Sequence, residues 1–369
     1  MTNFYNPVEI VWSSNYEQVI KDLLIRENKK KVVLITSERF KKSAQTSSLL
    51  SIFNEYIYCT DIETNPSVES CQRALDCVKN TASDVVIAIG GGSGLDTAKA
   101  VRLAVYTQCF FMENLLNTAV LDYKEKPLFI AVPTTHGTGS EVTMWATIWD
   151  KKKKMKYSLS DSKNYPDYAL YDTSLTTTLS IENSIISVLD ALSHAFETLW
   201  NKNENSQSDE YAYKAIKVIF ENLKNLDNYP SFEMRKNFLQ AASWAGLAFS
   251  NTKTAAAHSI SYPLTIEYNI PHGIACSLPL KPLLKINKEA IKHKLEILWE
   301  RLAVSGEEQF WKEIEPVIKG RIPFQLREFS IKKDELSGLV KKSFTKGRMD
   351  NNMVDLTEED VLHILQEIY

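Results

Sequence analysis

The sequence predicts an α/β N-terminal domain built on a parallel sheet (residues 1–178) and an all-α C-terminal domain (residues 179–369). Three observations predict this fold class. The chain has 369 residues, too many for one ordinary core. Short β-branched apolar runs alternate with helical stretches in the first part. After about Thr178 long helical patterns dominate, so we expect the boundary there and ligands in a cleft between the domains.

Three apolar runs in the N-terminal part are predicted to be buried strands. Each is bounded by polar or turn residues, as expected for a strand covered on both faces. They are residues 32–35, 85–89 and 128–132, the last of which Pro133 should end. Residues 67–80 and 97–106, which lie between these strands, have helical patterns.

The C-terminal part is predicted to be helical in six segments, residues 181–200, 208–223, 233–249, 254–264, 288–304 and 356–368. The last segment begins at Thr357, whose hydroxyl and following acidic residues suit a helix N-terminus.

Composition excludes several classes of protein. The net charge of -3 gives no global attraction to nucleic acid or anionic membrane. The densest basic run, residues 151–154, is expected at the solvated tip of a hairpin. No stretch approaches the roughly 20 apolar residues of a membrane span, and the N-terminus does not resemble a signal peptide. The odd number of cysteines, 5, and the lack of a CxxC pair favour a reducing cytoplasm. Any metal should therefore bind to histidine and carboxylate.

A glycine-rich loop, residues 90–94, follows the predicted strand 85–89 and precedes a helix that should begin near Leu95. Glycines such as Gly91 and Gly92 let the backbone approach a ligand, and free N–H groups at a helix N-terminus attract phosphate. We therefore predict a diphosphate site, the alternative being an unliganded tight turn. The pattern is neither the G-x-G-x-x-G fingerprint nor a Walker loop.

A second loop, residues 133–141, follows strand 128–132 and alternates small hydroxyl residues with glycine. Open α/β sheets bind ligands at the carboxyl ends of their strands, so this loop is expected to contact the same ligand. His136 within it is expected to be a surface or hydrogen-bonding residue rather than a catalyst.

Four residues are predicted to bind one divalent metal. Asp190 and His194 are spaced i,i+4 on an apolar helix that carries no Lys or Arg to neutralise the carboxylate. A self-contained Asp-His hydrogen bond is the alternative for that pair alone. His258 lies among small residues and His272 lies on a Pro-His-Gly turn. One carboxylate and three imidazoles suit Fe(II) or Zn(II). His293 and His363, in contrast, are expected at the surface.

Together these pieces resemble the iron-containing (group III) alcohol dehydrogenase family over nearly the whole chain. The resemblance is carried, in order, by Asn65-Pro66, residues 90–93 with Asp96 and Lys99, residues 133–141, residues 190–197, His258, residues 271–273, and residues 348–352. It implies the dehydroquinate synthase-like fold, NAD(P)H as cofactor, and homodimers or larger homo-oligomers.

The same resemblance implies roles for individual residues. The metal ligands would be Asp190, His194, His258 and His272. The cofactor contacts would be Asn65, Gly92, Ser93, Thr134, Thr135, Thr138, Thr143 and Lys156, in addition to Gly91 of the predicted diphosphate site.

Two positions depart from the family pattern. Tyr262 stands where the family usually has a histidine credited with proton relay, and tyrosine, with an unperturbed pKa near 10, is a poorer base. Relay through Tyr262 is thus a hypothesis, with water or a cofactor ribose hydroxyl as alternatives. Ser37 stands where many NAD-preferring relatives have an aspartate. Its neutral side chain, with Arg39 nearby, permits NADP, although Glu38 argues against it.

The implied reaction is hydride transfer between nicotinamide C4 and a carbonyl carbon polarised by the metal. Residues 149–150, 197–200 and 254–265 resemble a branch associated with reduction of phosphonoacetaldehyde to 2-hydroxyethylphosphonate. Lys253 would supply charge for the anionic head group, and Glu197 would support the metal ligands; for each, a plain structural or solvated role is the alternative.

Three other functions stay open at this stage. They are a general short-chain aldehyde reductase, a metal- and NAD-dependent lyase of the dehydroquinate synthase type, and a catalytically silent binding protein.

Overall fold

A computed structural model of the chain describes residues 3–117, 122–153 and 155–369. The chain divides into two compact units. The sheet unit contains residues 6–135 and 140–176, and the helical unit contains the described part of residues 1–5 together with residues 136–139 and 177–369. The four residues 136–139 thus leave the sheet unit and group with the helices.

Six parallel strands form the sheet, in the order β1-β8-β5-β4-β2-β3. The three predicted strands are confirmed as β2 (Lys31–Thr36), β4 (Val85–Gly90) and β5 (Leu128–Pro133), although β5 includes the proline expected to end it. Three further strands were not predicted, namely β1 (Glu9–Trp12), β3 (Glu55–Cys59) and β8 (Tyr168–Tyr171). β1 and β3 are short edge strands with polar, exposed positions, so they lack a continuous apolar run.

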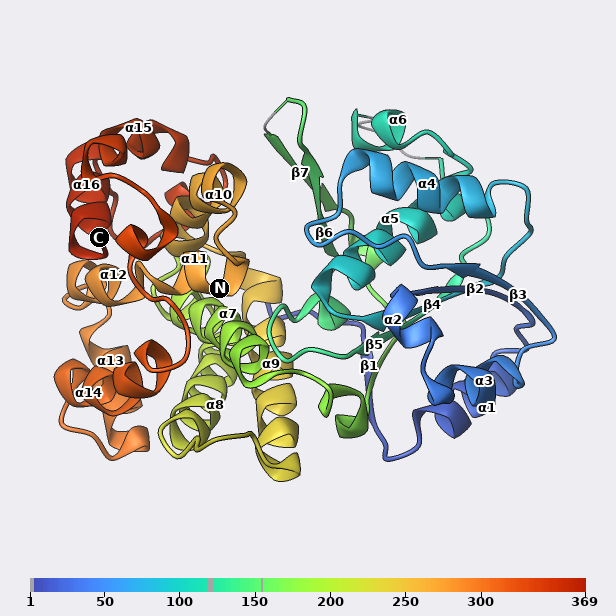
Figure 1. Cartoon of the computed structure of the whole chain (residues 1–369), viewed down its shortest axis with the longest axis horizontal. Coiled ribbons are helices and arrows are strands. Elements are labelled where there is room, and N and C mark those ends of the chain that lie inside the picture. Colours follow the sequence, from blue (N-terminus) through green and yellow to red (C-terminus); the bar gives the residue numbers. More distant parts are fainter. Residues whose placement is uncertain (1–2, 118–121, 154) are drawn as a thin grey trace. The chain divides into compact units, whose positions relative to one another are not determined.

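Helices cover both faces of this sheet (Figure 1). α1 (Tyr16–Arg26) and α3 (Ala44–Leu50) share an apolar core with Val32 and Leu34 of β2. α4 (Val68–Val78), α5 (Gly92–Thr107) and α6 (Met112–Asn117) share a second core with Val33 and Ile35. Successive side chains of β2 therefore enter opposite cores, as the continuous apolar run predicts. The short α2 (Glu38–Lys41) follows β2 directly.

A separate hairpin is formed by β6 (Trp145–Asp150) and β7 (Met155–Ser160), which pair antiparallel. Lys151, Lys152 and Lys153 are exposed at its tip, which confirms the prediction for this part of the basic run. Lys154 lies outside the described residues.

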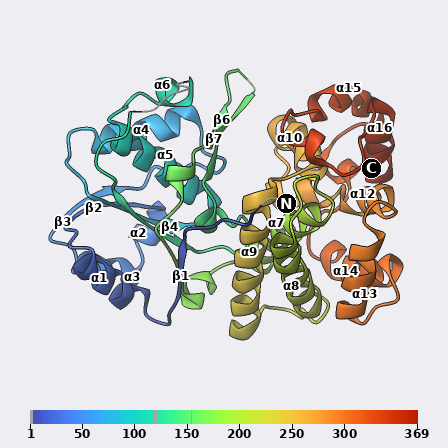
Figure 2. The same cartoon turned by 180° about the vertical axis from the view of Figure 1, so that it is seen from behind.

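The helical unit is built around α7 (Ile181–Leu199), which contacts α8 (Ser206–Leu223) and α9 (Phe232–Thr252), as Figure 2 shows from behind. All six predicted helices are confirmed, the others being α10 (Ala256–Tyr268), α13 (Lys292–Leu302) and α16 (Glu358–Glu367). Thr357 caps α16, as expected. α10 continues past Pro263, beyond its predicted end.

Within the described residues of the helical unit, four shorter or interrupted helices were not predicted. They are α11 (His272–Ser277), α12 (Leu280–Asn287), α14 (Glu307–Lys319) and α15 (Leu336–Val340). None of the helices among the described residues combines the length and apolar character that a bilayer crossing needs.

Candidate metal centre and nucleotide-binding loops

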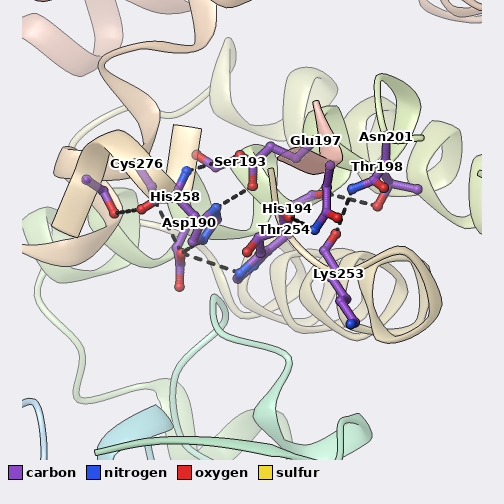
Figure 3. Close-up of polar contacts among 12 residues, drawn as sticks. Asp190, Ser193, His194, Glu197, Thr198, Asn201, Lys253, Thr254, His258 and Cys276 are labelled. Carbon is purple, nitrogen blue, oxygen red and sulfur yellow. Dashed lines mark hydrogen bonds and ion pairs between the residues drawn. The ribbon is translucent and has the colours of Figure 1, made fainter. Parts of the chain in front are cut away.

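Three imidazoles converge on one carboxylate inside the helical unit, and Figure 3 shows two of them, His194 and His258, beside Asp190. α7 carries Asp190 and His194, α10 carries His258, and α11 begins at His272. From Oδ1 of Asp190, the Nε2 atoms of these histidines lie at 3.9, 3.6 and 3.8 Å, respectively. The structure therefore brings together all four residues predicted to bind metal.

Ring packing fixes the orientation of two of these histidines. The His194 ring is stacked on Phe249 at a centroid distance of 4.1 Å and on His258 at 4.5 Å. Both histidines are buried, whereas the side chain of His272 is 30% exposed. His272 is therefore the most exposed of the four residues.

Close backbone packing explains the Pro-His-Gly turn. Pro271 precedes the first turn of α11, and a Cβ atom at Gly273 would lie 1.9 Å from the carbonyl oxygen of Ile186 in α7. Only glycine lets α11 approach α7 so closely. This approach holds His272 opposite Asp190.

Glu197 contacts both the backbone and the imidazole of His258. It lies two turns after Asp190 on α7, and its side chain is fully buried. The backbone N–H of His258 donates to Oε1 of Glu197 at 3.0 Å, and Nδ1 of the imidazole lies 2.5 Å from Oε2. With Nδ1 engaged in this way, Nε2 of His258 faces Asp190. This is the carboxylate–histidine arrangement that orients metal-binding imidazoles in proteins.

The electrostatics of this cluster favour a cation. Burial alone would raise the pKa of Asp190, but the three surrounding imidazoles hold it well below its ordinary value. Burial lowers the pKa of His194 to about 3. Burial would also lower the pKa of His258, yet Glu197 and Asp190 together raise it to about 10. Two buried carboxylates thus stabilise positive charge here, either a proton on His258 or a divalent ion.

A divalent metal fits these residues. Nε2 of His258 is buried without a hydrogen bond to any described residue, although it lies 3.6 Å from Asp190. Asp190, His258, His272 and Cys276 each place one ligand atom within 4.8 Å of the other three. One carboxylate with several imidazoles is a donor set that suits Fe(II) or Zn(II).

Sequence reasoning missed Cys276 at this centre. Its thiol is fully buried and donates to Oδ1 of Asp190 at 3.4 Å. The spacing from His272 is i,i+4 on one helix, the same relation that relates Asp190 to His194. That spacing is present in the sequence, but the expectation that a metal would bind to histidine and carboxylate alone left the thiol out.

Replacing Glu197 by glutamine is expected to weaken metal binding by about 10- to 100-fold. The amide keeps the shape of the carboxylate, but its NH₂ group must face either the backbone N–H or Nδ1 of His258, both of which donate. A metal titration of the dialysed protein measures the effect.

Glu182→Gln is the matched control, because that residue is exposed in the first turn of the same helix. Equal metal affinity in both variants would contradict a supporting role for Glu197.

In the sheet unit, the two predicted loops lie at neighbouring strand ends. β4 and β5 pair up to Gly90 and Pro133, and the N–H of Thr134 donates to the carbonyl of Gly90 at 3.0 Å. A Cβ atom at Gly91 would lie 3.0 Å from the Thr135 side chain, so the two loops touch. The structure therefore brings the glycine loop and the start of the threonine loop together.

The glycine loop also contacts the turn that carries Asn65. The backbone N–H of Asn65, which has a left-handed φ of 55°, donates to the hydroxyl of Ser93 at 3.1 Å. α5 begins at Gly92, earlier than predicted, because Gly91 in an extended conformation already forms its N-cap. From β2 the chain continues to β3, at one edge of the sheet. From β4 it continues to β5, in the opposite direction across the sheet, so the strand order reverses between β2 and β4. Parallel α/β sheets bind nucleotides at this kind of reversal.

The second half of the threonine loop has a different environment from the one expected. A Cβ atom at Gly137 would lie 2.6 Å from the carbonyl oxygen of Ser187, and one at Gly139 would lie 2.5 Å from Cα of Gly246. Those two glycines therefore allow close packing on α7 and α9. His136 was expected to be a surface or hydrogen-bonding residue, and the first of these alternatives is wrong, because this packing buries it completely beside Phe238. Thr138 lies in the same four-residue segment of the helical unit.

A buried polar network accounts for Asp96 and Lys99. The ammonium of Lys99 donates to the hydroxyls of Ser140 at 2.9 Å and of Thr143 at 3.1 Å, and Ser140 in turn donates to Asp96 at 2.6 Å. Burial lowers the pKa of Lys99 to about 8. The hydroxyl of Thr143 is thus held inside the sheet unit.

The other predicted residues lie at identifiable places. Ser37 is exposed at the end of β2, where its hydroxyl caps α2 by accepting from the N–H of Phe40 at 3.2 Å. Lys156 is half-buried on β7, with its ammonium 5.8 Å from the ring centre of Trp149. Tyr262 is buried on α10, one turn after His258, and Lys253 is exposed at the end of α9.

His293 and His363 are both exposed, which confirms their predicted surface positions.

Comparison with known proteins agrees with this fold. Residues 7–173 match the family described as iron-containing alcohol dehydrogenase, and residues 184–369 match the C-terminal region of the Fe-containing alcohol dehydrogenase family. The chain therefore belongs to the iron-containing alcohol dehydrogenase family. It is an NAD(P)-dependent alcohol or aldehyde dehydrogenase that uses a divalent metal.

Particular relatives cover the whole chain. It is 26% identical to the NADPH-dependent butanol dehydrogenase of Clostridium saccharobutylicum, over all of this chain and 98% of the relative. It is 28% identical to the NAD-dependent methanol dehydrogenase of Bacillus methanolicus, over 99% of each chain. Among solved structures, the sulfoacetaldehyde reductase of Bifidobacterium kashiwanohense in complex with NAD+ matches with a TM-score of 0.92 and 26% identity, over all of this chain and 98% of that one.

Proposed function

We propose that the protein reduces a short aldehyde with an anionic head group, with phosphonoacetaldehyde, which gives 2-hydroxyethylphosphonate, as the leading substrate. The observation that carries the reaction class is the convergence of three Nε2 atoms within 3.6 to 3.9 Å of Asp190 Oδ1. A general short-chain aldehyde reductase is the alternative within the same class.

The proposed roles follow from the positions of the residues. Asp190, His194, His258 and His272 would hold the metal, and Glu197 would orient His258. When bound, the metal would supply Lewis-acid polarisation of the aldehyde oxygen, and reduced nicotinamide would supply the hydride. In this proposal the nucleotide-binding domain is residues 1–178 and the metal-binding domain is residues 179–369.

The proposed cofactor contacts are the residues predicted from the sequence. Support comes from the contacts among Gly91, Thr135, Asn65 and Ser93 at the carboxyl edge of the sheet. The full set is Ser37, Asn65, Gly91, Gly92, Ser93, Thr134, Thr135, Thr138, Thr143 and Lys156.

Tyr262 would hold the proton that the product oxygen requires. It is 6% exposed, and it follows His258 by one turn of α10, so the two side chains lie on the same side of that helix. A phenol can donate a proton to a developing alkoxide, which is a stronger base than the phenolate.

Two observations support the anionic substrate. The sulfoacetaldehyde reductase that matches over the whole chain is named for a two-carbon aldehyde with a sulfonate group, which is chemically close to phosphonoacetaldehyde. Residues 197–200 and 254–265, which resemble the phosphonoacetaldehyde branch, form the end of α7 and the segment leading through α10. Lys253, just before that segment, would supply the positive charge.

The substrate is tested with the full chain loaded anaerobically with Fe(II) or Zn(II). Oxidation of NADH and NADPH is followed with phosphonoacetaldehyde, sulfoacetaldehyde, propanal and butanal. We expect the highest kcat/KM for phosphonoacetaldehyde. A higher kcat/KM for the neutral aldehydes would overturn the substrate and favour the general reductase.

Ser37→Asp is expected to lower kcat/KM for NADPH relative to NADH by at least about tenfold. Aspartate keeps the N-cap of α2, because its carboxylate also accepts from the N–H of Phe40, but it adds a charge that repels a 2′-phosphate. Ser37→Asn is the uncharged control. The interpretation of this position is contradicted if aspartate and asparagine give the same ratio.

Two further expectations belong to the proposal. All five cysteines are free thiols, which supports a reducing cytoplasmic location. Homo-oligomers, at least dimers, are expected from the family resemblance, and sedimentation of the purified chain tests this.

A further inference from the structure

The backbone of Lys253 adopts a conformation that favours glycine. Lys253 ends α9 with φ 67° and ψ 178°, and its N–H donates to the carbonyl of Phe249 at 2.8 Å. Residues with a side chain are strained in this region of backbone space, and such strain concentrates where it serves a function.

Three asparagine side chains donate to three successive backbone carbonyls of this segment, and Figure 3 shows one of them, Asn201, beside Lys253. Nδ2 of Asn203 donates to the carbonyl of Thr252 at 3.3 Å, and Nδ2 of Asn201 donates to that of Lys253 at 3.1 Å. Nδ2 of Asn351 donates to the next carbonyl, that of Thr254, at 2.9 Å. We call these three asparagines the amide clamp.

The clamped segment is tied to the helices that carry the metal centre. The hydroxyl of Thr252 lies 3.4 Å from that of Thr198, which donates to the carbonyl of His194 at 3.0 Å. In the other direction the segment leads within five residues to His258. The backbone at Lys253 is therefore connected to two of the proposed ligands, to His194 through these hydroxyls and to His258 along the chain.

The choice of residue at this position needs a reason. Glycine would adopt the same backbone without strain, and the neighbours Thr252 and Thr254 are buried whereas Lys253 is exposed. In Figure 3 the Lys253 amine points away from Asn201, toward the same side of the view as the Asp190 carboxylate. The strain is thus compatible with a lysine side chain that is retained for what it binds.

We propose that Lys253 is the residue that selects aldehydes with an anionic head group, and that the amide clamp fixes its position. Its ammonium would pair with a phosphonate or sulfonate while the aldehyde carbon lies at the metal centre. This assignment rests on the proposed function and names the residue that determines its substrate class.

The test compares Lys253→Gly, which removes both the charge and the strain, with Lys253→Met, which removes only the charge. Metal-loaded full-length protein is assayed with phosphonoacetaldehyde, sulfoacetaldehyde and propanal. In both variants the kcat/KM ratio of each anionic aldehyde to propanal is expected to fall at least about tenfold, mainly through KM. Lys253→Gly should also melt at a higher temperature than Lys253→Met. A fall confined to one anionic aldehyde identifies that head group as the one bound.

Lys236→Met, an exposed charge removal on the same helix, is the control and should keep the wild-type ratio. An unchanged kcat/KM ratio in both Lys253 variants would overturn the assignment. A wild-type preference for propanal would also overturn it, but it would leave the reaction class intact. If none of the aldehydes supports oxidation of reduced nicotinamide by the wild-type protein, the reaction class fails and this assignment fails with it.

Discussion

His258→Ala is expected to lose the metal and to lower kcat/KM by about three orders of magnitude. The imidazole of this proposed ligand lies against two buried carboxylates, Glu197 on the side of Nδ1 and Asp190 on the side of Nε2. Its removal leaves Oε2 of buried Glu197 without its imidazole partner, and it also removes a proposed donor to the metal. Metal content after dialysis and the rate of NAD(P)H oxidation measure the two effects.

His293→Ala serves as the control for this change, because that imidazole is exposed on α13. Retention of one equivalent of tightly bound metal by His258→Ala would show that the ligand set is wrong.

Gly273→Ala is expected to destabilise the helical unit by about 3 kcal/mol or more. The new methyl group would lie 1.9 Å from a backbone oxygen of α7, and backbone cannot move aside as the end of a side chain can. Because His272 immediately precedes Gly273, separation of α11 from α7 should also weaken metal binding. Denaturant unfolding with and without metal measures both effects.

Gly338→Ala is a control with the opposite expected sign. A Cβ atom there meets no atom within 4 Å, and the residue lies inside α15, so alanine should stabilise the protein by about 0.5–1 kcal/mol. If Gly273→Ala were as stable as Gly338→Ala, the close contact between α11 and α7 would be contradicted.

The fold class was predictable because the elements at the centre of each unit have continuous apolar sequences. β2, β4 and β5 are continuous apolar runs, since each is covered on both faces, and α7 is apolar on most of its surface. β1 and β3 lie at the sheet edges and have no such run, and α14 carries Pro316 inside an otherwise helical pattern. Local patterns therefore identify elements packed on all sides and miss those at the margins.

The metal centre was predictable only in part. The i,i+4 spacing of Asp190 and His194 is local, whereas the approach of His258 and His272 depends on how α10 and α11 pack on α7. The resemblance to a known family supplied that long-range information. It did not supply Cys276, the close packing of Gly137 and Gly139, or the burial of His136, which follow from the chain's own contacts.

The central claim, a metal-dependent reductase, is tested most directly by the stoichiometry of cofactor oxidation. Protein stripped of metal is titrated with Fe(II) or Zn(II), and NAD(P)H oxidised is compared with aldehyde consumed. We predict no turnover without metal, saturation at one metal per chain, and one NAD(P)H oxidised per aldehyde reduced. Turnover without net consumption of NAD(P)H would contradict the account, because it would indicate a lyase that regenerates its cofactor. Tight metal binding without any turnover would also contradict it and would indicate a silent binding protein.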